Sequence, residues 1–271
     1  MGNEYVFEDR DAEQRRLDLQ ATLFDPLTER VFRSAGLRDG MRVLDLGSGA
    51  GHVALLAARL VGREGRVLGV ERDQQAVADA RARARRIGAS NVEFVVADVQ
   101  TLEGVQGTFD AVVGRLILMY LPDPVVALRR AVERVRPGGL VIAHEGDLTY
   151  DWAVPQSAQW RQVREWMLRT LERASVDARM GLRLHRCFIE AGLPAPTMTL
   201  EAAVAGGDAA PAWGWANLVR GAVPLMERLG VATSGDVAAD TLADRLLSDV
   251  RREEGIVIGP PLVGAWSVLP Q

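Results

Sequence analysis

The sequence predicts an α/β protein built on a doubly wound, mostly parallel sheet, with a helical segment before it. Between residues 41 and 146, short apolar segments alternate with helical ones. Strands that alternate with helices form parallel βαβ units, and strands without polar alternation are covered on both faces. A chain of 271 residues, 48% of them hydrophobic and 25% charged, is also large enough to bury a full core.

The elements follow in order along the chain. A first helix is expected over residues 11–35, where apolar side chains recur every three or four residues. The expected elements of the sheet region are strands 41–46, 67–70, 92–97, 109–113 and 140–145 and helices 53–61, 74–87 and 123–135. Pro137-Gly138-Gly139 predicts a sharp turn before the fifth strand.

The second half of the chain has a different character, because all six tryptophans lie between Trp152 and Trp266. We expect helices at 156–175, 180–191, 212–229 and 236–252, and strands at 196–204 and 262–269. Pro224 is expected to kink the third of these helices.

Composition excludes several classes of function. One cysteine, Cys187, rules out an internal disulfide framework and a multi-cysteine metal site, and the three histidines lack metal-ligand spacing. All 32 basic residues are arginine, which excludes enzymes that need a lysine. The net charge of −4 argues against nucleic acid as a partner, and no apolar run is long enough to span a membrane. The polar, acidic start predicts a cytoplasmic protein.

The strongest chemical signal is the run Gly47-Ser48-Gly49-Ala50-Gly51-His52 between a predicted strand and a predicted helix. Such a loop lets a ligand approach the backbone, although an ordinary turn also uses glycines for packing. Glu71 ends the second strand, where an acid can accept hydrogen bonds from ribose hydroxyls or remain a surface carboxylate. Asp98 ends the third strand and can bind an adenine amine or cap a helix. His52 stands where the dinucleotide fingerprint requires its third glycine.

Residues 41–145 resemble the class I S-adenosylmethionine (SAM)-dependent methyltransferases. The resemblance rests on VLDLGSGAGH, VERD, VADV, FDAVVGRLILMYLPDP and RPGGLV, which occur in the family's order and spacing. Within the family, the small-molecule branch that includes ubiquinone/menaquinone-biosynthesis enzymes is the most similar. The resemblance implies a Rossmann-like sheet of seven strands. It also implies three parts of the chain: a helical lid (1–40), a SAM-binding core (41–150), and a part with substrate-cap helices and the last two strands (151–271).

The resemblance also implies which residues bind SAM and its product, S-adenosylhomocysteine. The glycine loop would line the methionine moiety, Glu71 would hold the ribose, and Asp98 would bind the adenine amine. Arg115 and Leu116 would contact the cofactor through their backbone. The full set of expected cofactor residues is Tyr5, Gln20, Gly47, Ser48, Gly49, Glu71, Arg72, Asp98, Val99, Arg115 and Leu116. Gln20 is equally explained as a polar position on a packed helix.

Differences between this sequence and the motifs of other branches of the family exclude some classes of methyl acceptor. Enzymes of the family that methylate nucleic-acid amines carry an Asn/Asp-Pro-Pro-aromatic motif where this chain has Gly114-Arg115-Leu116-Ile117. Metal-dependent, catechol-type relatives place an acid at the position of Gly114, and a glycine cannot ligate a metal. We therefore expect methylation, without a metal, at oxygen or carbon of a small, largely hydrophobic metabolite. Expected substrate-binding residues are Met119, Tyr120, Tyr150, Trp152 and His185.

His144, at the end of the fifth strand, is the first candidate for a catalytic base, although a satisfied structural histidine fits the same position. Weaker candidates for the base are Tyr120, Glu145, Asp147, Tyr150 and His185. Two alternatives remain at this point. The chain can bind SAM without transferring methyl, as in a biosynthetic cyclase, or it can be a nicotinamide-dependent oxidoreductase. The sequence does not determine the oligomeric state.

Overall fold

The computed structural model describes residues 10–271, which form two compact units. The sheet unit comprises residues 24–145, 180–200 and 263–271. The helical unit comprises residues 146–179 and 201–262, together with the described residues up to Leu23. Both units are therefore built from segments that are distant in sequence.

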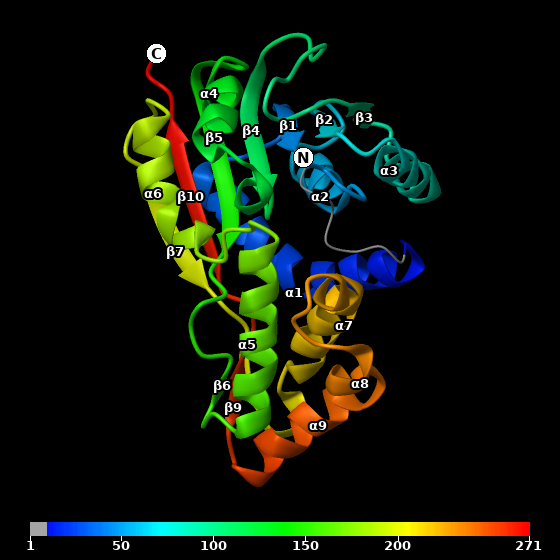
Figure 1. The fold of residues 1–271 in the computed structure, drawn as a ribbon. Helices are drawn as coiled ribbons and strands as arrows, with labels where there is room; N and C mark the ends of the chain where they lie inside the picture. The colour runs from blue at the N-terminus through cyan, green and yellow to red at the C-terminus, as the bar shows by residue number, and fades with distance from the viewer. Residues whose placement is uncertain (1–9) are drawn as a thin grey trace. The chain divides into compact units, whose positions relative to one another are not determined.

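A seven-stranded sheet forms the centre of the sheet unit, with the order β3-β2-β1-β4-β5-β10-β7 (Figure 1). Its first five strands pair in parallel. β10 runs against β5, because Gly139 pairs with Leu269 near one end and Asp147 pairs with Pro261 near the other. The strands are β1 (Arg42–Leu46), β2 (Arg66–Glu71), β3 (Val92–Val96), β4 (Phe109–Arg115), β5 (Val135–Gly146), β7 (Thr197–Glu201) and β10 (Leu262–Val268). The predicted mostly parallel α/β fold is confirmed.

Helices pack on this sheet through alternating strand residues. Ala111 and Val113 of β4 belong to a core that also contains Val31 and Phe32, whereas Val112 between them points to the opposite face. This core is built with the C-terminal part of α1 (Arg10–Ala35), with α2 (His52–Leu60) and with α3 (Gln74–Arg86). α4 (Pro124–Val132) and α6 (Met180–Glu190) lie together away from this core (Figure 1).

The Pro-Gly-Gly stretch does not form the predicted turn. β5 begins at Val135 and continues through it, with Gly138 at a φ of 72° and a register shift against β4 between Phe109 and Ala111. The N–H of Gly138 donates to the Pro270 carbonyl at 3.1 Å, so residues near the end of the chain hold this stretch as a bulge within β5. The helix expected to reach residue 135 consequently ends at Val132.

The helical unit combines helices with a small three-stranded sheet of order β6-β9-β8. Its elements are α5 (Ala158–Arg173), α7 (Ala212–Arg228), α8 (Ser234–Val237), α9 (Ala239–Arg252), the 3-10 helix η2 (Gly207–Ala209), β6 (Ala153–Val154), β8 (Val204–Gly206) and β9 (Ile256–Ile258). In its core, the rings of Trp152 and Trp215 stack with centroids 3.6 Å apart and planes at 7°. Both side chains are fully buried.

Two predictions for this half of the chain are corrected. The helix expected over 236–252 is two helices, because Ala238 takes a left-handed φ of 45° and a capping box at Thr233 starts α8 earlier. The strand expected over 196–204 divides into β7 and β8, which belong to different sheets. Among the residues that the structure describes, no helix is long and apolar enough to cross a membrane.

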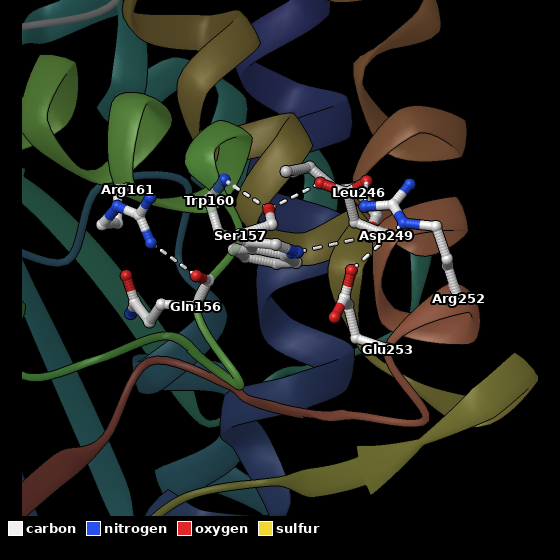
Figure 2. A network of polar contacts seen from close by, with 8 residues as sticks. All are labelled: Gln156, Ser157, Trp160, Arg161, Leu246, Asp249, Arg252 and Glu253. Atoms are coloured by element: carbon white, nitrogen blue, oxygen red, sulfur yellow. Dashed lines mark hydrogen bonds and ion pairs between the residues drawn. The ribbon is translucent and has the colours of Figure 1, made fainter.

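Ser157 connects α5 to α9 within the helical unit (Figure 2). Its hydroxyl accepts a hydrogen bond from the Trp160 N–H at 3.2 Å, which caps α5, and donates to Asp249 at 2.5 Å. Asp249 also pairs with Arg252 at 2.5 Å, and the indole N–H of Trp160 donates to the Leu246 carbonyl at 3.2 Å. One hydroxyl thus satisfies a helix terminus and a carboxylate on another helix.

We expect Ser157→Ala to lower the free energy of unfolding by about 2 kcal/mol, because it removes a helix cap and a hydrogen bond to a charged group. Urea denaturation followed by circular dichroism measures this loss. Ser90→Ala, at an exposed serine of the sheet unit, is the control and should change the value by less than about 0.5 kcal/mol. A Ser157→Ala protein as stable as the control would show that this connection contributes nothing.

Candidate functional site

The loop between β1 and α2 presents bare backbone. Gly47, Gly49 and Gly51 all have left-handed φ values, of 64°, 48° and 86°, which glycine adopts at no steric cost. A Cβ added to Gly49 would meet no heavy atom within 4 Å, so the space beside this residue is open. α2 begins directly afterwards at His52, and its first N–H groups favour an anionic ligand group.

Glu71, the last residue of β2, holds this loop against the next one. One carboxylate oxygen accepts a hydrogen bond from the Gly49 N–H and the other accepts one from the Asp73 N–H, each at 3.1 Å. The side chain is half-buried, and its neighbour Arg72 is exposed. The predicted ribose acceptor and the predicted glycine loop are therefore in direct contact.

Asp45 and Ser48 place further polar groups around the start of the loop. Their side chains are 1% and 6% exposed, and their oxygens have no hydrogen-bond partner of good geometry among residues 10–271. Burial raises the pKa of the Asp45 carboxyl to about 8, although the charge of Arg115 opposes the shift. Buried oxygens with unused hydrogen-bonding capacity beside an open glycine loop fit a ligand that carries polar groups. Asp45 was not among the predicted site residues, although an acid inside an apolar strand was the available signal.

Asp98 lies two residues beyond the end of β3. It is exposed, and its carboxylate accepts a hydrogen bond from the Gln100 N–H at 2.8 Å, so it forms a turn of its own. Val99 beside it is 7% exposed. Both roles considered for Asp98, a turn acceptor and a ligand for an amine, are compatible with this position.

Arg115 ends β4 and is fixed by α1. Its side chain is 6% exposed, and its guanidinium donates to Asp25 and to the Thr28 hydroxyl, each at 2.9 Å. The next residue, Leu116, has a left-handed φ of 53°, which costs a leucine about 1–2 kcal/mol. Strain of this kind persists only where the surroundings hold it, and it is concentrated at functional sites. The backbone here is the part predicted to contact the cofactor.

His144 is 0% exposed, and its Nδ1 lies 3.1 Å from the Thr28 hydroxyl. That hydroxyl donates to the Phe24 carbonyl at 2.9 Å, so it accepts from the imidazole, which carries its proton on Nδ1. Burial, followed by the charge of Arg115, lowers the pKa of His144 to about 3. The imidazole is therefore neutral and weakly basic at physiological pH. Its role as a catalytic base stays a prediction, and its contacts are those of a structural histidine.

The structure places the predicted substrate residues in different settings. Met119 (4% exposed) and Tyr120 (half-buried) lie on the 3-10 helix η1 (Leu118–Tyr120), directly after the β4 exit. His185 is exposed on α6.

Tyr150 and Trp152 belong to the helical unit. The Tyr150 hydroxyl donates to the Gly259 carbonyl, and burial raises the pKa of the phenol. Trp152 donates its indole N–H to the Leu148 carbonyl at 3.2 Å, and its ring is stacked on Trp215. Trp152 is thus a core residue here, and its contact with a substrate stays a prediction.

The two remaining predicted cofactor residues are Gln20 and Tyr5. Gln20 is half-buried on the part of α1 that belongs to the helical unit, and Tyr5 lies outside the described residues. Within the described chain, no group of three His, Cys, Asp or Glu side chains is arranged to hold a metal ion.

Comparison with known proteins identifies the family. A family model described as a methyltransferase domain matches residues 37–192, more than half of the chain. An arsenite methyltransferase of Aquipseudomonas alcaligenes is 42% identical over 110 residues, which are 38% of this chain and 32% of that protein. The ubiquinone/menaquinone biosynthesis C-methyltransferase UbiE of Klebsiella pneumoniae is 34% identical over 112 residues, which are 41% of this chain and 45% of that protein.

A solved structure shares the fold of this chain. A SAM-dependent methyltransferase from Aquifex aeolicus superimposes with a TM-score of 0.51 at 15% identity, over 89% of this chain and 88% of that one, so the two share a fold. The matched segments span about a third to a half of the length of the two curated relatives. Because the family model covers most of the sheet unit and the site geometry accompanies it, the chain belongs to the class I SAM-dependent methyltransferase family.

Proposed function

We propose that this protein is a SAM-dependent methyltransferase that acts on oxygen or carbon of a small, largely hydrophobic metabolite. The observation that carries the proposal is the contact between Glu71 and the Gly49 N–H, which joins a carboxylate to an open, left-handed glycine loop at a helix N-terminus. Ribose hydroxyls and an amino-acid moiety are ligands that suit these two groups. SAM would supply an electrophilic methyl group on its sulfonium.

The residues of the chain would bind and orient the two reactants. Glu71 would accept from the ribose, the backbone of Gly47 to Gly49 would border the methionine moiety, and Asp98 would accept from the adenine amine. The buried Asp45 would receive a donor from the same ligand. Because displacement requires in-line approach, positioning supplies much of the rate, and a strong base is not essential.

The acceptor class is supported by the residues that follow β4. Leu116, Ile117, Leu118 and Met119 form an apolar run after the strand, and a largely apolar lining is typical of sites for small molecules. Gly114, the next-to-last residue of β4, offers no side chain to a metal. Quinone precursors, phenols and other secondary metabolites share the hydrophobic character proposed for the acceptor.

Calorimetric titration with S-adenosylhomocysteine tests the cofactor half. We expect one saturable site in the parent protein. Glu71→Ala should raise the Kd about 30-fold, because the loss of hydrogen bonds to a charged group costs about 2 kcal/mol. Glu64→Ala, at an exposed glutamate in the turn before β2, should bind as the parent does. A folded parent that binds no S-adenosylhomocysteine would refute the proposal.

Methyl transfer itself is tested by incubation with SAM carrying a labelled methyl group and a panel of phenols and quinone precursors. Label on an acceptor oxygen or carbon supports the proposal. If SAM binds but no acceptor in a broad panel is labelled, the activity part of the proposal is wrong.

The Asp45 carboxyl should make stability depend on pH. Its pKa of about 8 lies above the ordinary value of 3.8, so the folded protein holds a proton that the unfolded chain releases between these values. Stability is therefore lost as pH rises from about 4 to 8. As pH rises through that range, we expect the free energy of unfolding of Asp45→Asn to increase relative to that of the parent by about 1.4 kcal/mol for each pH unit. Urea denaturation at pH 6.5 and 7.5 measures the gain, with the exposed Asp39→Asn as control.

His144 should have the opposite effect. With a pKa of about 3 instead of 6.5, it remains neutral in the folded protein while the unfolded chain takes up a proton, so stability is lost as pH falls below about 6.5. As pH falls from 6.5 to 4.5, we expect the free energy of unfolding of His144→Asn to increase relative to that of the parent by about 1.4 kcal/mol for each pH unit. Denaturation curves at both ends of this range measure the change, and the exposed His185→Asn is the control. If the free energy of unfolding changes with pH equally in His144→Asn and in the parent, the lowered pKa is contradicted.

A further inference from the structure

The backbone after β4 has a geometry that attracts an anion. Leu116 is left-handed, with a φ of 53°, and Ile117 follows in the right-handed region, with φ −118° and ψ −42°. When residues of opposite hand follow one another, their successive N–H groups converge on one side and form a nest for a negatively charged atom. We refer to the N–H groups of Ile117 and Leu118 as the β4 nest.

The protein fills the β4 nest with its own carboxylate. Glu145 Oε1 accepts hydrogen bonds from the Ile117 N–H at 2.9 Å and from the Leu118 N–H at 2.8 Å. The Leu116 N–H donates to the carbonyl of His144, the residue before Glu145, at 3.0 Å. Three consecutive N–H groups are therefore held by two consecutive residues of β5, and Glu145 is 0% exposed. A buried carboxyl oxygen that accepts from two N–H groups satisfies both donors inside the protein.

The segment held in this way touches the glycine loop. A Cβ added to Gly47 would lie 2.4 Å from Ile117 Cδ1, and one added to Gly114 would lie 3.0 Å from Ile117 Cγ2. The Ile117 side chain is thus packed against glycines at the ends of β1 and β4. Any movement of the Ile117 backbone would change the space beside Gly47.

We propose that Glu145 is a positioning residue for the cofactor site. It fixes the strained Leu116–Leu118 backbone through the β4 nest, and Ile117 transmits that position to the glycine loop. Glu145 itself touches neither reactant. This inference rests on the proposed function, because it assigns the residue that shapes the SAM site and not a second site. Glu145 is therefore assigned a role other than that of a catalytic base.

Four variants test the proposal with S-adenosylhomocysteine as the probe. Glu145→Ala empties the β4 nest, Glu145→Gln keeps an acceptor oxygen without the charge, and Ile117→Ala keeps the nest but removes the contact with Gly47. Asp110→Ala is the matched control, because Asp110 also accepts from a backbone N–H and from an arginine (Arg42 and Arg136), but at the start of β4. Calorimetry gives the Kd, circular dichroism the Tm, and hydrogen exchange the protection of the Ile117 and Leu118 amides.

Glu145→Ala should raise the Kd for S-adenosylhomocysteine at least tenfold and speed exchange of both amides. Glu145→Gln should restore the Kd to within about threefold of the parent, and Ile117→Ala should raise it about fivefold while both amides stay protected. Asp110→Ala should lower the Tm and leave the Kd unchanged, which separates positioning from stability. If Glu145→Ala does not fold, the Gln and Ile117 variants carry the test.

The binding measurements distinguish a failure of the positioning role from a failure of the proposed function. If the parent binds S-adenosylhomocysteine and Glu145→Ala or Ile117→Ala binds it equally well, the positioning role is overturned while the proposed function stands. If the folded parent does not bind it at all, the proposed function fails and the positioning role fails with it.

Discussion

Parallel strand pairing is the constraint on which the candidate site depends. β1 pairs in parallel with β2 on one side and with β4 on the other, so the last residues of all three strands reach the same edge of the sheet. The strand order reverses at β1, and ligands of open α/β sheets bind beside such a reversal. Asp45, Glu71 and Leu116 are distant in sequence, and this pairing alone brings them to one edge.

The sequence predicted this sheet well because parallel strands are recognised from local composition. Each is a short apolar run between helical segments, so the strands can be inferred without knowledge of distant contacts. The break between α8 and α9 has a local cause, but other failures occurred where a distant partner decides the conformation. Residues 137–139 have turn chemistry, yet hydrogen bonds with Leu269 and Pro270 hold them as a bulge within β5. The short strand β9 (Ile256–Ile258), which was not predicted, pairs with β6 on one side and with β8 on the other.

In the candidate site, too, features with a local sequence pattern could be predicted, and features that depend on distant contacts could not. The glycine loop and Glu71 could be predicted, because glycines between a strand and a helix and an acid at a strand end are local patterns. Glu145 was only a weak candidate for a base, and its bonds to Ile117 and Leu118 depend on a backbone conformation that leucine rarely adopts. His144 was placed correctly at the end of its strand, but nothing local indicated that α1 would supply Thr28 as its partner.

The stack of Trp152 on Trp215 has an optical consequence. Five of the six tryptophans, all except Trp266, lie in the helical unit, and two of these are in parallel ring contact. Indole fluorescence and near-ultraviolet dichroism therefore report mainly on the helical unit, whereas far-ultraviolet dichroism records both. Since a protein with two compact units need not unfold in one step, a difference between these signals would reveal which unit loses its structure first.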